Sequence, residues 1–223
     1  MLFYSWHCIK ERKKKMDQNL YQRNELLAQT VIKGLSSRNM TGFYARDKEE
    51  AKKIALSLIP EGSSIGQGGC MTSREIGLIQ ALKEGKYHFI DRDQMDPREA
   101  LLATYDCDVF LSSANAMTMD GILVNIDGNA NRVSCIANGP RKVIFLVGMN
   151  KICPDLDSAM KRARNVAAPS NAMRFPINTP CKKTGQCFDC KQPDTICCQF
   201  LITRYSHHEG RINVILINDS LGF

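Results

Sequence analysis

The chain has 223 residues, of which 43% are hydrophobic and 24% are charged. These values are ordinary for a globular protein and exclude a disordered or fibrous one, and the length suits one α/β domain with one or two insertions. No apolar run approaches the roughly eighteen residues that a membrane-spanning helix needs, so we do not expect an integral membrane protein.

The net charge of +7 is concentrated at the N-terminus, where five basic residues against Glu11 give residues 1–15 a net charge of +4. The remaining charge is too diffuse to favour a nucleic-acid partner, which needs a concentrated basic face. Apolar residues precede the basic ones at this end, the reverse of a secretory signal, so we expect a cytoplasmic protein. Because Met16 directly precedes the first helix pattern, we interpret residues 1–15 as a non-native or disordered extension and residues 16–223 as a single domain.

Helix and strand patterns alternate along most of the chain, which favours a mainly parallel sheet built from βα units. Two helices begin with a capping-box pattern, Asp47-x-x-Glu50 and Thr72-x-x-Glu75. The first half is predicted to contain helices at 19–36, from Asp47 to Pro60, from Thr72 through Leu82 and at 97–105, and apolar or strand segments at 42–45, 63–66, 87–90 and 109–112.

The second half departs from this alternation. Asp120-Gly121 lies between apolar residues and predicts an antiparallel hairpin whose returning strand is 122–126. We then predict a short helix at 132–138, a buried strand at 143–147, a helix at 156–167, an irregular Cys-rich appendage at 169–198 and a last strand at 212–217. The predicted fold is α/β: a three-layer, Rossmann-like, mainly parallel sheet flanked by helices, with an antiparallel hairpin insertion and a Cys-rich C-terminal loop.

A glycine-rich turn joins the predicted strand 63–66 to the next helix. Gly66, Gly68 and Gly69 would let backbone N–H groups approach a ligand, and the start of a helix favours an anion such as a phosphate or carboxylate. The alternative is a tight turn with no ligand. Met71 stands where a dinucleotide fingerprint needs glycine, and no P-loop lysine follows, so neither NAD nor ATP is expected. We add Thr72, at the start of that helix, to the ligand-binding candidates.

A second group of polar residues follows the strand 109–112 and the hairpin. In open α/β sheets ligands bind beyond the carboxyl ends of the strands, where Ser113 and Asn115 should lie. Arg132 is suited to clamping a carboxylate or phosphate, and Asp127 to proton transfer. Asn129 completes the group. The alternative is ordinary turn chemistry, since Asp-Gly and Gly-Asn pairs are common in turns.

Ten cysteines without an export signal favour reduced thiols, metal ligands or buried hydrophobes over disulfides. Cys70 fits a buried inert thiol better than a nucleophile. Four cysteines of the appendage are spaced so that their thiolates could hold zinc or an iron–sulfur cluster; they are Cys181, Cys187, Cys190 and Cys197. The alternative is a set of reduced thiols that fasten a loop to the domain.

Taken in order, several of these segments resemble the LUD family, the lactate-utilisation domain proteins of LutC type. The resemblance rests on 64–69, 71–72, 75–77, 113–116, 120–121, 124–129, 132–133, 139–143, 148–152 and the cysteine stretch. It implies a fold of the ribose-phosphate isomerase, glucosamine-phosphate deaminase and CoA-transferase type, and a role in oxidising L-lactate to pyruvate beside an iron–sulfur subunit. By analogy with the sugar-phosphate enzymes, it implies a substrate site at Gly66, Gly68, Gly69, Asn115, Asp127, Asn129 and Arg132.

The leading hypothesis is therefore a LUD protein that binds a small organic anion and takes part in lactate or related organic-acid oxidation, within a complex or a homo-oligomer. A stand-alone enzyme acting on a sugar phosphate or CoA thioester is a second hypothesis. A metal-bearing, non-catalytic subunit of an oxidoreductase complex is a third.

Overall fold

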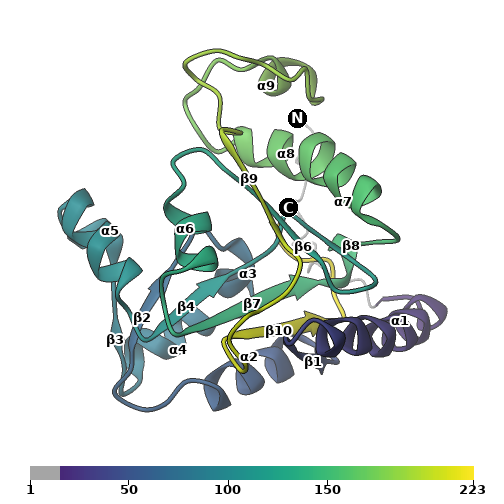
Figure 1. Ribbon diagram of the computed structural model, residues 1–223, viewed down its shortest axis with the longest axis vertical. Helices are drawn as coiled ribbons and strands as arrows, with labels where there is room; N and C mark the ends of the chain where they lie inside the picture. The colour runs from purple at the N-terminus through teal and green to yellow at the C-terminus, as the bar shows by residue number, and fades with distance from the viewer. Residues whose placement is uncertain (1–15) are drawn as a thin grey trace, which may run out of the picture.

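The main sheet has six parallel strands in the order β1-β10-β7-β4-β2-β3. The computed structural model describes residues 16–223, and the extension expected at residues 1–15 lies outside them (Figure 1). The strands are β1 (Thr41–Ala45), β2 (Ser64–Gln67), β3 (His88–Phe89), β4 (Val109–Ser112), β7 (Lys142–Gly148) and β10 (Ile212–Ile217).

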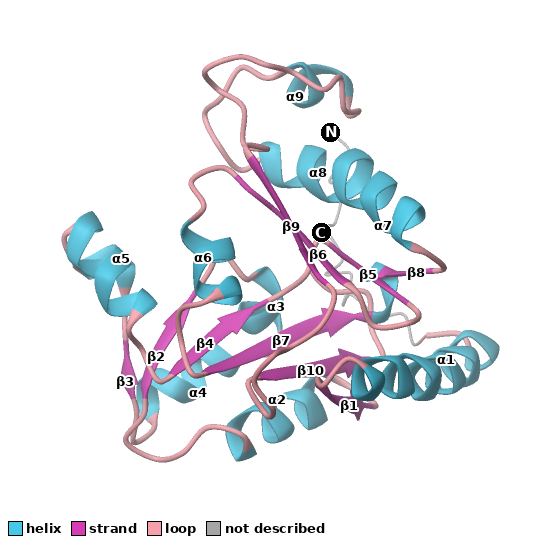
Figure 2. Cartoon of the chain, viewed as in Figure 1, coloured by secondary structure: helices cyan, strands magenta, loops and turns pink. Residues whose placement is uncertain are grey.

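Helices cover both faces of this sheet, as the three-layer prediction requires (Figure 2). Successive side chains of a strand point to opposite faces, and β7 shows the result: Phe145 packs into one hydrophobic core with α1, whereas Ile144 and Leu146 pack into the other with α2 and α4. The helices of this part are α1 (Gln18–Ser37), α2 (Lys48–Ser57), α3 (Met71–Glu75), α4 (Leu78–Glu84), α5 (Pro97–Tyr105) and α6 (Asn131–Ala137).

A second, four-stranded sheet contains the predicted hairpin and extends it. Its order is β8-β5-β6-β9, with β6 antiparallel to both β5 and β9. The strands are β5 (Ala116–Thr118), β6 (Leu123–Asp127), β8 (Ile152–Cys153) and β9 (Gln199–Thr203). Alanines of a long helix pack on it; this helix comprises α7 (Leu156–Arg162), a π-helical turn at Ala163–Ala167 and α8 (Ala168–Ala172).

Most of the predicted elements are confirmed, some of them to the residue. The helix at 97–105 and the strands at 109–112 and 212–217 have the predicted bounds. Asp47 caps α2 by accepting a hydrogen bond from the backbone of Glu50, as its capping-box pattern predicts. Three further short segments are helical: the 3₁₀ turns Arg92–Gln94 and Met149–Lys151, and α9 (Pro180–Thr184). No helix within residues 16–223 is both long and apolar enough to cross a bilayer.

Three local predictions are wrong. Cys70, not Thr72, is the N-cap residue of α3, and Glu75 instead accepts a hydrogen bond from the backbone of Gly222. The helix expected through Leu82 is broken at Gly77, whose φ of 68° ends α3 and starts α4. Pro169 does not begin the appendage, because proline is tolerated in the first turn of α8. The irregular stretch therefore starts at residue 173.

Candidate ligand-binding site

The carboxyl ends of β2, β4, β6 and β7 surround one cavity of about 470 Å³. Parallel strands end at the same edge of a sheet, so the loops that follow them meet there. Among the predicted site residues, those that line this cavity are Gly69, Ser113, Asn115, Asp127, Asn129 and Arg132. Gly66 and Thr72 lie outside the lining, and Gly68 lines a neighbouring cavity.

The three glycines of the turn have three different roles. A Cβ on Gly66 would lie 2.8 Å from Thr104 Cγ2, so this residue lets α5 pack closely on β2. A Cβ on Gly68 would lie 2.8 Å from both Cγ and Cδ of Arg132, so the missing side chain makes room for that arginine. A Cβ on Gly69 would meet nothing within 4 Å, and this residue opens into the cavity.

Arg132 is held in place by a network of acceptors. Its Nη2 donates to Asn115 Oδ1 at 3.0 Å and also to the carbonyl of Ile126, while its Nε lies 3.8 Å from Asp127 Oδ2. Burial lowers the pKa of Arg132. Within residues 16–223 no hydrogen bond uses Nη1, which leaves this nitrogen for a ligand.

Asp127 organises the start of α6. Its Oδ2 accepts hydrogen bonds from the backbone N–H groups of Arg132 and Val133, at 3.0 and 3.1 Å, and its Oδ1 accepts one from Asn129 at 3.1 Å. A carboxylate is the side chain best suited to the free N–H groups of a helix start. The preceding turn has Ala130 at φ 61°. Both carboxylate oxygens of Asp127 are therefore engaged in holding the loop that carries Arg132.

Lys151 is the site residue that the sequence reasoning missed. It lies in the turn after β7, it is only 3% exposed, and its Nζ donates to Ser113 Oγ at 2.9 Å. No carboxylate among residues 16–223 lies within ion-pair distance of this amine. Burial, together with the neighbouring cations Arg162 and Arg132, lowers the pKa of Lys151 to about 8. A lysine three residues after a buried apolar strand was a usable signal, because ligands bind beyond the carboxyl ends of parallel strands.

The hydroxyl of Thr72 lies near this amine. Thr72 is fully buried, and its Oγ1 has no hydrogen-bond partner within residues 16–223. A Cβ built on Gly222 would lie 3.1 Å from both Lys151 Nζ and Thr72 Oγ1, so the two donors approach the same point. Ser113 links the amine to the sheet, because its Oγ also donates to the carbonyl of Leu146 at 2.7 Å.

The charge of the cavity is strongly positive. Among the side chains of residues 16–223 that line it, four are cationic and one, Asp127, is acidic; the cations are Arg92, Arg132, Lys151 and Arg174. Cavities lined by one sign of charge attract ligands of the opposite sign. A neighbouring cavity of about 340 Å³ shares Arg92, Asn129 and Asn131 with it, so the cleft continues toward α5.

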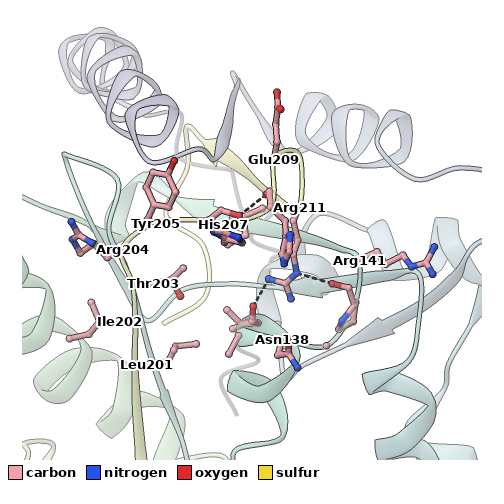
Figure 3. Close-up of a pocket in the computed structure, with 17 residues that line it drawn as sticks. Asn138, Arg141, Leu201, Ile202, Thr203, Arg204, Tyr205, His207, Glu209 and Arg211 are labelled. Atoms are coloured by element: carbon pink, nitrogen blue, oxygen red, sulfur yellow. Dashed lines mark hydrogen bonds between the residues drawn. The ribbon is translucent and has the colours of Figure 1, made fainter.

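Another cavity, of about 730 Å³, lies between the end of α6, β9 and residues 204–211 (Figure 3). The half-buried Arg211 of this cavity already has protein partners, because it donates to the carbonyls of Cys135, Ile136 and Pro140 at 2.7 to 3.0 Å. These contacts satisfy the end of α6. None of the predicted site residues lines this cavity.

The cysteines proposed as metal ligands gather around a separate small pocket. Cys181, Cys187, Cys190 and Cys197 all line a space of about 40 Å³ beside α8. Burial and then the neighbouring thiols raise the pKa of Cys197 to about 11.

Comparisons with known proteins identify a matching family and similar solved structures. The family model described as the LUD domain matches residues 28–217. A solved DUF162 family protein from Deinococcus radiodurans has a TM-score of 0.51 and 13% identity, covering 87% of this chain and 98% of that one. Ribose 5 phosphate isomerase A from Neisseria gonorrhoeae gives a TM-score of 0.32 at 17% identity, over 49% of this chain and 56% of that one. No curated protein sequence matches the chain.

Proposed function

The chain belongs to the LUD domain family, which is associated with lactate utilisation, and on that premise we propose that its cavity binds a small organic anion. In this proposal the protein takes part in the oxidation of L-lactate or a related organic acid. Because that oxidation removes two electrons, an electron acceptor is needed, and we propose that an iron–sulfur partner subunit supplies it.

The observation that carries the proposal is the buried, unpaired amine of Lys151. Burying a charged group without a counter-charge is costly, and a bound anion offsets that cost. Two hydrogens of the ammonium group remain after its bond to Ser113 Oγ.

The rest of the cavity suits a carboxylate with a short carbon body. Arg132 adds a second fixed cation, and its Nη1 is the nitrogen without a protein acceptor in the described residues. Ala114, Ile126 and Phe175 line the same cavity and provide apolar contacts for carbon atoms. A hydroxy acid or oxo acid combines these two features.

Lys151 is also the better candidate for proton transfer. The sequence pointed to Asp127 for that role, but three backbone N–H groups occupy the oxygens of this carboxylate. A group that transfers protons works best when its pKa is near the operating pH, and the charged amine of Lys151 would act as the acid. The pKa of Lys151, about 8, meets that condition.

A second candidate function follows from the length of the cleft. The cavity of about 470 Å³ continues into the one of about 340 Å³ through Arg92 and Asn129. This combined space accommodates more than a three-carbon acid. A sugar phosphate or CoA thioester is therefore the competing ligand class.

Ligand-dependent thermal stabilisation tests both candidates, because a ligand that binds the folded state raises its melting temperature. The probes are L-lactate, pyruvate, ribose 5-phosphate and acetyl-CoA, with wild type, Lys151→Met and Lys86→Met. Lys86 is an exposed lysine that precedes β3 and lines neither cavity of the cleft, so it is the control for loss of a lysine charge. We expect stabilisation by lactate or pyruvate that survives in Lys86→Met and disappears in Lys151→Met.

Stabilisation by the phosphate ligands alone would favour the second candidate, and no stabilisation by any probe would contradict both. Growth of a gene-deletion strain on L-lactate as the carbon source tests the metabolic role separately. Unaltered growth would count against a role in lactate utilisation while leaving anion binding intact.

A further inference from the structure

The irregular stretch at residues 173–198, which we call the cysteine segment, lacks a core of its own. Within this fully described stretch Thr179 alone is buried. Its only helix is the five-residue α9, and it projects beyond α8, away from the main sheet (Figure 1). Long loops without secondary structure lose much conformational entropy on ordering. Something other than apolar burial must therefore hold the segment in place.

The candidate for that role is the small pocket beside α8. Four half-buried thiols line it, separated along the chain by five, two and six residues; we call them the pocket thiols: Cys181, Cys187, Cys190 and Cys197. Phe188, Phe200 and Pro169 line the same space and limit the access of water. Cys198, although adjacent in sequence, is exposed and does not line the pocket.

The turn around Cys187 is ordered by hydrogen bonds to its sulfur. Asp189 adopts a φ of 52°, and its backbone N–H donates to Cys187 Sγ at 3.4 Å. Arg164 donates to the same sulfur at 3.7 Å and to Asp189 Oδ1 at 2.6 Å. These contacts hold the sulfur of Cys187 at the edge of the pocket.

The sulfurs surround the pocket without yet meeting at its centre. Within residues 16–223 no three ligating side chains are positioned to hold an ion. Closure therefore needs rotation of cysteine side chains about χ1, which the half-exposed setting of the pocket thiols allows. The pocket has a volume of about 40 Å³, and its four thiols match the four ligands of a tetrahedral zinc ion.

We propose that the pocket thiols bind a single zinc ion tetrahedrally and so fasten the cysteine segment to the domain. On binding, four thiols release their protons to solvent and form four zinc–sulfur bonds. The resulting centre carries two negative charges, and Arg164 lies beside it. No electron is transferred.

The zinc centre also fixes one wall of the ligand cavity. Phe175 and Ile196, at the two ends of the cysteine segment, line the cavity at the carboxyl ends of the strands. The backbone N–H of Cys198 donates to the carbonyl of Asp127 at 2.9 Å, which joins the segment to the loop that carries Arg132. Loss of zinc is therefore expected to loosen this wall while the main sheet stays folded.

Metal analysis of the full chain, purified without chelators after growth with added zinc, tests the proposal. Wild type and Cys198→Ser are expected to hold about one zinc per chain, and Cys197→Ser and Cys190→Ser much less. Cobalt substitution gives a second readout, since a tetrahedral thiolate site produces intense visible bands and sulfur-to-cobalt charge transfer. Circular dichroism checks that each variant is folded, and limited proteolysis reports cleavage within 173–198 after treatment with EDTA.

Three results would overturn the proposal. These are a folded wild type without zinc that also fails to take up cobalt, equal zinc loss in Cys198→Ser and Cys197→Ser, and iron with acid-labile sulfide in place of zinc. The last result would assign the same thiols to an iron–sulfur cluster. Because the readouts are metal content and spectra, failure here leaves the anion-binding proposal untouched.

Discussion

Cysteines lie in different surroundings in the body of the protein and in the cysteine segment. In the body of the protein Cys70, Cys107 and Cys135 are buried, and burial raises the pKa of Cys107 to about 12 and of Cys135 to about 11. These thiols act as small apolar groups. In the cysteine segment Cys187 is half-buried and accepts hydrogen bonds from two donors.

This difference shows that the two regions are ordered by different forces. The strands β4 and β10 are buried along their whole length, so apolar burial holds them. No apolar side chain of the cysteine segment, residues 173–198, is buried, and its order depends on polar contacts and on the proposed metal centre. The ligand cavity lies between the two regions and takes residues from both.

The sharpest test compares two phenylalanines. Phe145 in β7 is fully buried, whereas Phe188 in the cysteine segment is 56% exposed. Phe145→Ala is expected to lower the free energy of unfolding by about 3–5 kcal/mol, because it removes apolar contacts and leaves a cavity. Phe188→Ala is expected to change it by less than about 1 kcal/mol. Urea unfolding followed by circular dichroism measures both, and similar losses would contradict the comparison.

The second test concerns the buried charge of Lys151. Its pKa falls from 10.5 to about 8 on folding, and each unit corresponds to about 1.4 kcal/mol, so the charged amine costs the folded state about 3 kcal/mol at pH 7. Lys151→Met is expected to raise stability at pH 7 by about 2–3 kcal/mol while abolishing anion binding. A gain in stability with a loss of binding distinguishes a ligand site from a structural contact.

The pH profile of the same residue gives a check with a defined sign. Above about pH 8 the folded amine loses its proton, whereas the unfolded amine keeps it up to about 10.5. The unfolded state then binds more protons than the folded state. The contribution of Lys151 to the free energy of unfolding of the wild type therefore rises from about pH 8 to about pH 10.5. Anion affinity falls over the same range. Both trends should be absent in Lys151→Met and present in Lys86→Met.

The third test uses neighbouring glycines. Gly68→Ala places a Cβ 2.8 Å from Arg132 Cγ and Cδ, whereas Gly69→Ala meets nothing within 4 Å. Overpacking of this kind costs about 1–3 kcal/mol, and displacement of Arg132 should also weaken anion binding. Gly69→Ala should leave the free energy of unfolding nearly unchanged. Equal free energies of unfolding for the two variants would contradict this prediction, because they would show that the Arg132 side chain moves aside at little cost.

The smallest effect on global stability is expected at Arg164. Its ion pair with Asp189 is largely exposed, and such pairs contribute at most about 1 kcal/mol. Arg164→Met should leave urea unfolding of the main sheet unchanged but accelerate proteolysis within 173–198. Arg46→Met, which removes another exposed ion pair, is the control. A large loss of global stability would contradict the separation of the two regions.

The local sequence pattern predicted most of the helices, strands and turns, because each of them depends mainly on residues that are close together in the chain. The apolar run at 143–147 and the Pro97 start of α5 are of this kind, as is the Asp120-Gly121 turn, where Gly121 has a φ of 92°. The capping box at Thr72 failed because a capping pattern is a weak preference that tertiary packing overrides: the hydroxyl is buried near Lys151 instead. Strand β9 was not predicted because most of its residues are exposed.

The sequence by itself determined the α/β class, the glycine turn and the polar residues that follow each strand. It did not determine which of those residues meet, because the contacts join loops far apart in the chain: Lys151 reaches Ser113, and Arg132 crosses Gly68. Only the strand order, which places β4 between β7 and β2, brings these loops together. The sequence predicted a small-anion site at the glycine turn, and the tertiary structure shows that Gly68 makes room for Arg132 while Gly69 lines a cavity with four cationic side chains.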